Sequence, residues 1–149
     1  MTAAKANDEH ALLKRVMEEH VAFNKYLGVK IESFDAAAPK LRFDMRPELV
    51  GNPVRKILHG GVISAVLDVA GGFAIMLSIA EDRGITPGSF PNIGTIDLRV
   101  DYLRPGRGKH FVATARIVRK GSRIAVIHME LHNDESELIA TGGGAYVVG

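Results

Sequence analysis

The sequence predicts an α+β fold in which a strongly curved antiparallel sheet wraps one long apolar helix. Three observations carry this prediction. Residues 60–82 are apolar or small almost throughout, and the run is far longer than a strand. Four segments with alternating side chains follow it, and a helix with two shorter alternating segments precedes it. A helix that is apolar nearly all round needs cover on most of its surface, which a curved sheet provides.

The N-terminal part is expected to form one helix and a strand pair. Residues 8–26 carry a helical apolar stripe, with Asp8 as the candidate cap and Gly28 as the stop signal. Two alternating stretches, 28–35 and 40–45, predict strands that are joined by a turn at AAAP.

Loops are predicted on both sides of the long helix, and strands follow the second loop. Residues 47–56 and 81–92 are rich in proline, glycine and polar side chains. The remaining segments alternate and are separated by the hairpin-like turns RPGRGK, RKGS and NDES. We expect strands at 93–103, 110–118, 123–132 and 137–148. The pattern gives no order for these strands in the sheet.

Bulk composition narrows the function classes. A chain of 149 residues suits one domain, expected here to span 1–149. The absence of cysteine excludes disulfides, thiolate metal sites and a cysteine nucleophile, and fits a reducing compartment. A net charge of +2 is too small to indicate nucleic-acid binding. The start of the chain has no signal-like apolar region, so we expect a cytoplasmic protein without stable membrane association.

The long helix carries a narrow polar stripe. Gly61, Ser64, Asp68, Gly71 and Gly72 fall on one side of a 3.6-residue period. Burying an unpaired carboxylate in such apolar surroundings is energetically costly, so a carboxylate that is kept there is a functional candidate. The common alternative for Asp68 is a partly exposed position on a helix edge. Each helical glycine costs roughly 1 kcal/mol relative to alanine. The adjacent glycines therefore predict close approach by a partner backbone or a ligand.

The start of this helix offers a second candidate group. The first amides of a helix have no internal acceptor, and Gly60 and Gly61 leave them unshielded, ready for a developing oxyanion. The alternative is a tight entry into the helix. Asp68 follows at about two turns, roughly 11 Å along the axis, so both groups are expected to point toward one cleft. His59 is a cap, a packing residue or an acid/base, with a structural role preferred.

Other hydrolase and metal signatures are missing from the sequence. Ser64 lies in no GxSxG elbow, which argues against a Ser-His-Asp hydrolase. The remaining histidines are scattered and match no metal-ligand spacing such as HExxH. We therefore expect neither a metal nor a cofactor.

Several motifs together resemble one known family. They are LHGG at 58–61 with Asp68 nine residues after His59, the strand GTIDLRVDYLRPGRG with its Y-x-x-P end, and the closing ELIATGGGAYVVG. They resemble the hotdog-fold acyl-CoA thioesterases of the PaaI-like (phenylacetyl-CoA thioesterase-like) branch, and among these the bacterial medium- and long-chain enzymes. The resemblance covers about residue 20 to the end, which leaves 1–19 as an N-terminal extension helix. It implies the hotdog fold.

The resemblance also implies roles for single residues. Asp68 matches the catalytic acid of the family, and Gly60 matches the residue whose N–H polarises the thioester carbonyl. Asn52 matches a polar residue that positions water or substrate, although it lies seven residues before the HGG histidine where six are expected, and Pro53 fills that place. Thr95 matches a hydroxyl that reaches the active site from the partner subunit.

The family is built from dimers whose sheets join edge to edge, often paired again into tetramers, with two shared sites per dimer. The implied substrate is an acyl-CoA ester of fatty acid metabolism. Gly61 and Ser64 would then contact it. Basic side chains at the turns are candidates for the phosphates of CoA, with ordinary solvated turns as the alternative: Arg104, Arg107, Lys109, Arg119, Lys120 and Arg123.

The implied reaction is hydrolysis of the thioester to a free acid and CoA. Asp68 would act as the general base toward water, or as a nucleophile through an anhydride. Two alternatives remain. One is a hydratase or dehydratase of the same fold, which would need a histidine such as His59. The other is a non-catalytic acyl-CoA-binding module.

Overall fold

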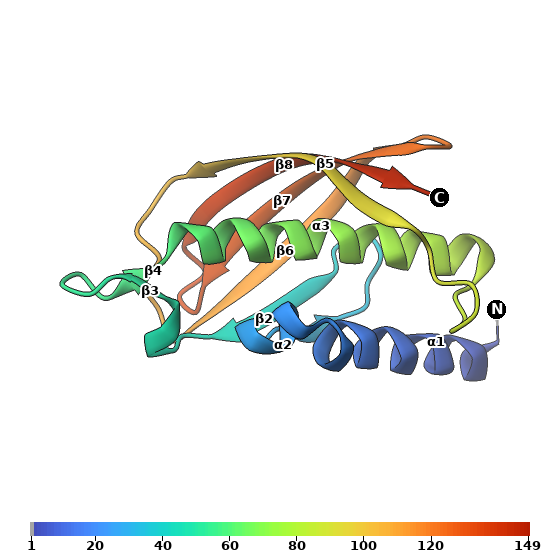
Figure 1. Ribbon diagram of the computed structural model, residues 1–149, viewed down its shortest axis with the longest axis horizontal. Coiled ribbons are helices and arrows are strands. Elements are labelled where there is room, and N and C mark those ends of the chain that lie inside the picture. Colours follow the sequence, from blue (N-terminus) through green and yellow to red (C-terminus); the bar gives the residue numbers. More distant parts are fainter. Residues whose placement is uncertain (1) are drawn as a thin grey trace.

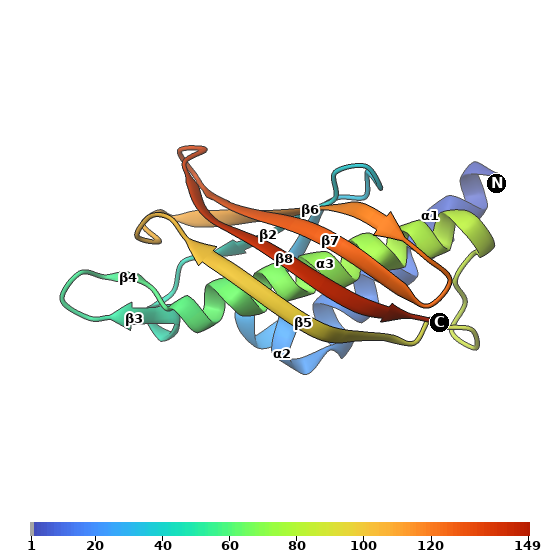
Figure 2. The same cartoon turned by 90° about the horizontal axis from the view of Figure 1, so that it is seen from above.

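The computed structural model describes residues 2–149. One long helix, α3 (Gly60–Arg83), packs against a six-stranded antiparallel sheet (Figures 1 and 2). The strand order is β1-β2-β6-β7-β8-β5, so β1 and β5 form the two edges. The strands are β1 (Lys30–Ser33), β2 (Lys40–Asp44), β5 (Ile93–Tyr102), β6 (His110–Lys120), β7 (Ile124–Asn133) and β8 (Leu138–Val148). The predicted α+β hotdog arrangement is confirmed.

The core lies between α3 and the sheet. Val66, Leu67, Phe73 and Ala74 of α3 are fully buried, and α3 contacts β5 to β8. Truncating a buried residue such as Phe73 costs about 3–5 kcal/mol in proteins of this kind. By length and hydropathy α3 would also pass as a membrane span, but 56% of its most apolar window is buried inside the protein. Its composition is therefore explained by its place in the core.

The N-terminal segment differs from the single predicted helix. Helix α1 (Ala3–Arg15) begins at a Thr2 cap, six residues before the predicted cap Asp8. A π-helical turn, η1 (Val16–His20), then leads to extended backbone at Val21, and α2 (Ala22–Leu27) ends at Gly28 with φ +75°. The stop at Gly28 is as predicted, whereas the break in the helix is not.

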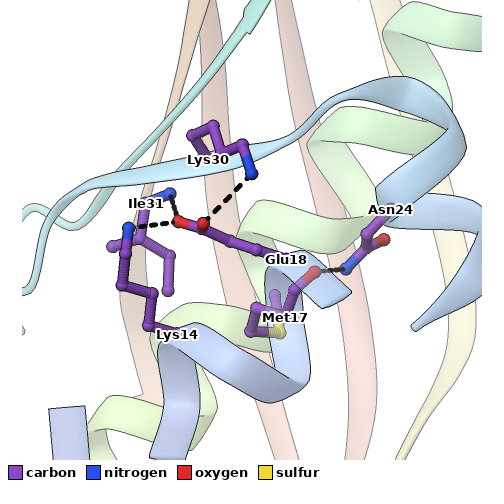
Figure 3. Close-up of polar contacts among 6 residues, drawn as sticks. All are labelled: Lys14, Met17, Glu18, Asn24, Lys30 and Ile31. Atoms are coloured by element: carbon purple, nitrogen blue, oxygen red, sulfur yellow. Dashed lines mark hydrogen bonds and ion pairs between the residues drawn. The ribbon is translucent and has the colours of Figure 1, made fainter. Parts of the chain in front are cut away.

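The π-helical turn places Glu18 beneath the start of β1. This carboxylate is only 5% exposed and accepts hydrogen bonds from the Ile31 N–H (2.8 Å), Lys14 (2.7 Å) and Lys30 (3.3 Å), as Figure 3 shows. Burial by itself raises the pKa of Glu18, but the three donors outweigh it and hold the pKa below the ordinary value. The contact with β1 gives a tertiary reason for the break that the helical pattern does not contain.

The predicted loop at 47–56 is partly ordered. It contains a 3₁₀ turn, η2 (Pro47–Leu49), and the strand β3 (Val50–Asn52), which forms a small hairpin with β4 (Ile57–Leu58) directly after the predicted loop. The Asn52 Oδ1 closes the hairpin by accepting from the N–H groups of Val54 (3.1 Å) and Arg55 (2.9 Å). The hairpin projects beyond the N-terminal end of α3 (Figure 1).

Candidate active site

Asp68 lies half-buried on α3 and is held by two hydroxyl groups from the sheet. Thr95 Oγ1 on β5 donates to Asp68 Oδ1 over 2.8 Å, and Tyr146 Oη on β8 donates to the same oxygen over 3.0 Å. Asp68 Oδ2 accepts no hydrogen bond from any residue within 2–149. The carboxylate therefore has one fixed oxygen and one oxygen left for a ligand. Thr95 makes this contact within a single chain.

Tyr146 is buried, with 1% of its surface exposed. Desolvation by burial raises the pKa of its phenol, and the neighbouring Asp68 and Asp97 carboxylates raise it further. The phenol therefore keeps its proton and remains a hydrogen-bond donor to Asp68. Gly71 makes room for it, since a Cβ there would stand 2.4 Å from Tyr146 Oη. The close approach predicted at the helical glycines is thus made by a tyrosine of the same chain at Gly71, while a Cβ on Gly72 would meet nothing within 4 Å.

The start of α3 is built from backbone groups. His59 caps the helix by accepting from the Gly61 N–H at Nδ1 over 2.8 Å, so its cap role is confirmed and the ring proton lies on Nε2. The Gly60 N–H donates to no acceptor within residues 2–149. Tyr102, half exposed on β5, packs over Gly60 and donates from Oη to its carbonyl oxygen over 3.0 Å.

A pocket of about 360 Å³ opens at this helix start. Gly60, Tyr102, Arg55 and Arg104 line it together with apolar residues of β4 and of the turn after β5. It combines the Gly60 backbone, whose N–H has no acceptor within residues 2–149, with two cationic side chains and an apolar wall. This set of groups suits an anionic, partly apolar ligand with a carbonyl oxygen to bind.

The two candidate groups do not line one pocket within a chain. Gly60 and Asp68 are eight residues apart on a straight helix, about 12 Å along its axis. Asp68 is absent from the lining of the pocket at Gly60. A single carbonyl group cannot contact both, because hydrogen bonds need about 3 Å. Within one chain, the pocket at Gly60 therefore does not include Asp68, and a cleft that holds both groups stays a prediction.

The basic side chains expected to bind phosphates also separate. Arg104, Arg107 and Lys109 lie at the turn near the start of α3, whereas Arg119, Lys120 and Arg123 lie at the β6–β7 turn, at the other end of the molecule (Figure 2). Lys120 is paired with Asp82 and donates to Ser78 Oγ over 2.6 Å. Arg104 pairs with Glu137 over 3.4 Å. One chain thus presents two small basic groups.

Other predicted residues have local structural contacts. Ser64 Oγ donates to the Gly61 carbonyl over 3.0 Å, a common contact within a helical turn. Asn52 uses Oδ1 in the hairpin turn, so only its amide nitrogen remains for a ligand. Sequence reasoning missed Tyr102 and Tyr146 as members of the two clusters. The one general signal that could have indicated Tyr146 is that a buried tyrosine hydroxyl usually has a hydrogen-bond partner.

Comparison with known proteins gives a consistent picture. The sequence profile of the Thioesterase superfamily matches residues 56–140. A Salmonella typhimurium relative named medium/long-chain acyl-CoA thioesterase YigI is 44% identical over 137 residues, which is 87% of each chain. A solved Shewanella oneidensis structure, described as related to the thioesterase superfamily, superposes with a TM-score of 0.88 at 39% identity and 100% coverage of both chains.

The fold extends to a more distant structure. The Escherichia coli PaaI protein of the phenylacetic acid degradation operon has a TM-score of 0.77 at 21% identity, over 95% of this chain and 94% of that one. At this identity the likeness concerns the fold alone. The profile match over more than half of the sequence, together with the 44% identical relative, shows that the chain belongs to the thioesterase superfamily of hotdog-fold enzymes.

Proposed function

We propose that the protein hydrolyses medium- to long-chain acyl-CoA thioesters to a free acid and CoA. The observation that carries the proposal is the Asp68 carboxylate, which two hydroxyl donors hold by one oxygen while the other stays open. The substrate class named for the Salmonella relative supports the choice of acyl-CoA and of chain length.

The active site is proposed to form between two copies of the chain. Strand β5 is an edge of the sheet, and most of its side chains are exposed. Unpaired strand edges are ready to pair with another chain. Antiparallel pairing of two β5 strands about a two-fold axis would bring the helix start of one copy toward the Asp68 of the other. Such a dimer has two sites, and in each site Thr95 and Asp68 belong to the same copy of the chain.

The reaction follows from these groups. The Gly60 N–H donates to the thioester oxygen and stabilises the negative charge that develops on it. Asp68 Oδ2 takes a proton from water while the water oxygen bonds to the carbonyl carbon; collapse of the adduct breaks the C–S bond, and the CoA sulfur leaves with a proton. Alternatively, Oδ2 attacks the carbonyl carbon directly, the C–S bond breaks as the CoA thiolate leaves, and water then opens the resulting anhydride and supplies the proton that the thiolate takes up.

The ligand would lie along surfaces that the structure already displays. The pocket at Gly60 offers an apolar wall from Ile57, Leu58 and Ile63, with Arg55 and Arg104 beside it for anionic groups. The half-exposed Ala65, Val69 and Met76 of α3 continue an apolar face past Asp68. A long acyl chain fits such a face better than a short one, because each buried methylene contributes about 0.8 kcal/mol.

The contact made by His59 argues against a hydratase. Its Nδ1 accepts from the Gly61 N–H, and its Nε2 bears the proton, so the neutral ring has no free acceptor for abstracting a proton from carbon. Asp68 lies about two helical turns away and does not orient this ring.

The first test is thiol release from a series of short, medium, long and aryl CoA esters, with Asp68→Asn as the isosteric variant. We expect turnover that peaks at medium or long chains and falls at least about 10²-fold in the variant. Binding of the esters without turnover by the wild type would favour the non-catalytic module. Unchanged turnover in Asp68→Asn would move the catalyst elsewhere.

A further inference from the structure

Both hydroxyl donors to Asp68 converge on the same carboxylate oxygen. Thr95 Oγ1 and Tyr146 Oη lie 2.8 and 3.0 Å from Oδ1, and they come from opposite partners of one strand pair, β5 and β8. Thr95 and Tyr146 are directly opposed in the register of that pair. The two donors are therefore fixed relative to each other by the sheet backbone. A carboxylate bound in this way has a single orientation about its last torsion.

Tyr146 has the properties of a fixed donor. Its ring is sealed in the core beside Met129, whose Sδ is 3.6 Å from the hydroxyl, and its other contact is with the backbone carbonyl of Asp68 at 3.3 Å. Burial and nearby carboxylates keep the phenol protonated. The helix makes room for it at Gly71, where any side chain would collide with the ring. The hydroxyl of Tyr146 can therefore reach Asp68 only because a glycine stands at position 71 of the helix.

We propose that Tyr146 is a positioning residue: its hydroxyl, with that of Thr95, fixes Asp68 Oδ1 so that only Oδ2 is presented to the thioester and the attacking water. This inference rests on the proposed hydrolase function. Tyr146 itself touches neither water nor substrate, since it is buried behind the carboxylate. Without its hydroxyl the carboxylate rotates more freely, and its productive orientation becomes one of several.

The test compares Tyr146→Phe with Met129→Leu in the intact full-length protein, using the best CoA ester. Tyr146→Phe removes only the hydroxyl. Met129→Leu alters packing at the same place and leaves the hydrogen bond to Asp68. We expect kcat to fall about tenfold or more in Tyr146→Phe with KM within about twofold, because a hydrogen bond to a charged group is lost behind the substrate. Met129→Leu should keep both constants within about twofold.

The outcomes separate the two proposals. Wild-type turnover with an unchanged kcat in Tyr146→Phe would overturn the positioning role and leave the hydrolase. An equal fall of kcat in Met129→Leu would show that packing, and not the hydroxyl, matters at this place, and would also overturn it. A rise in KM alone would assign Tyr146 to substrate binding instead. Absence of turnover in the wild type would remove the proposed function, and the positioning role with it.

Discussion

The two halves of the candidate site lie on one helix, and each half uses a different kind of chemical group. At the start of α3 the proposed functional group is a backbone N–H, held in place by the His59 cap and by Tyr102 across the Gly60 carbonyl. Two turns later the proposed functional group is a side chain, held by two hydroxyl groups from the sheet. A backbone donor needs only the correct helix start, whereas a carboxylate needs partners that limit its rotation. Each half should therefore respond to a different kind of substitution.

The largest effect is expected from Gly60→Pro. Proline is well accepted at the first position of a helix, and His59 already has the extended backbone that a following proline requires, with φ −64° and ψ 134°. The substitution removes the N–H, and we expect kcat/KM to fall about 10²- to 10³-fold. The measurement is steady-state hydrolysis of a long-chain CoA ester.

The matched control is Gly60→Ala, which adds a Cβ and keeps the N–H. Its Cβ would stand 3.3 Å from the exposed Tyr102 ring, which can shift, so a small loss of activity is expected. Equal losses in the alanine and proline variants would mean that the shape of the helix start matters and that the N–H does not bind the carbonyl.

Mixing inactive variants tests whether the two halves come from different copies. In a heterodimer of Gly60→Pro and Asp68→Asn, one of the two shared sites would be complete, so random mixing should restore about a quarter of wild-type activity. The measurement is activity after the two variants are unfolded and refolded together. Activity that stays at the level of the separate variants would contradict the shared site, because Gly60 of one copy and Asp68 of the other would then not act together.

A smaller effect is expected at the neighbouring glycines of α3. Gly71→Ala would place a Cβ 2.4 Å from the Tyr146 hydroxyl, so the ring must shift away from Asp68. We expect a loss of about 1–3 kcal/mol in the free energy of unfolding together with a lower kcat. Gly72→Ala meets nothing within 4 Å and should gain up to about 1 kcal/mol from helix propensity. Thermal unfolding and kcat for both variants decide the point, and equal behaviour of the two would contradict it.

The smallest effect on activity is expected at Glu18, which lies away from the site. Glu18→Gln replaces a buried carboxylate that has three donors, so we expect a loss of about 1–3 kcal/mol at neutral pH with unchanged kcat. The exposed neighbour in the same turn offers the control Glu19→Gln, which should change little. A lower kcat in Glu18→Gln would show that the N-terminal segment contributes to the site.

The stability that Glu18 provides should depend on pH in one direction. Its pKa in the folded protein lies below the ordinary value of 4.5, so the contribution is complete above that value and is lost as the pH falls through the lower folded pKa. Denaturant unfolding at several acidic pH values should show the wild type approaching Glu18→Gln in stability as the pH falls. A constant difference between them would mean that the charge on Glu18 is not what stabilises the fold.

Much of the fold could be predicted because its patterns are local. The apolar run of α3 and the alternation in β5 to β8 each lie within one stretch of sequence, and the predicted ranges agree with the structure to within a few residues. The break at Val16–His20 could not be predicted, because it depends on the contact between Glu18 and the Ile31 N–H thirteen residues later. Tyr146 and Asp68 are 78 positions apart, and only the order of β8 and β5 in the sheet brings Thr95 and Tyr146 together beside the helix.

The amide at Gly60, which has no acceptor among the described residues 2–149, also bears on how such a site can evolve. A main-chain donor is present whichever of the ordinary side chains follows His59, and among them only proline removes it. Mutations around the helix start can therefore reshape the pocket for new acyl groups while the donor persists. The carboxylate offers no such freedom, since every substitution of Asp68 changes the group that is proposed to react. Substitutions that change substrate preference are thus expected to accumulate at the N-terminal end of α3. Asp68, in the middle of the helix, is expected to stay unchanged under purifying selection.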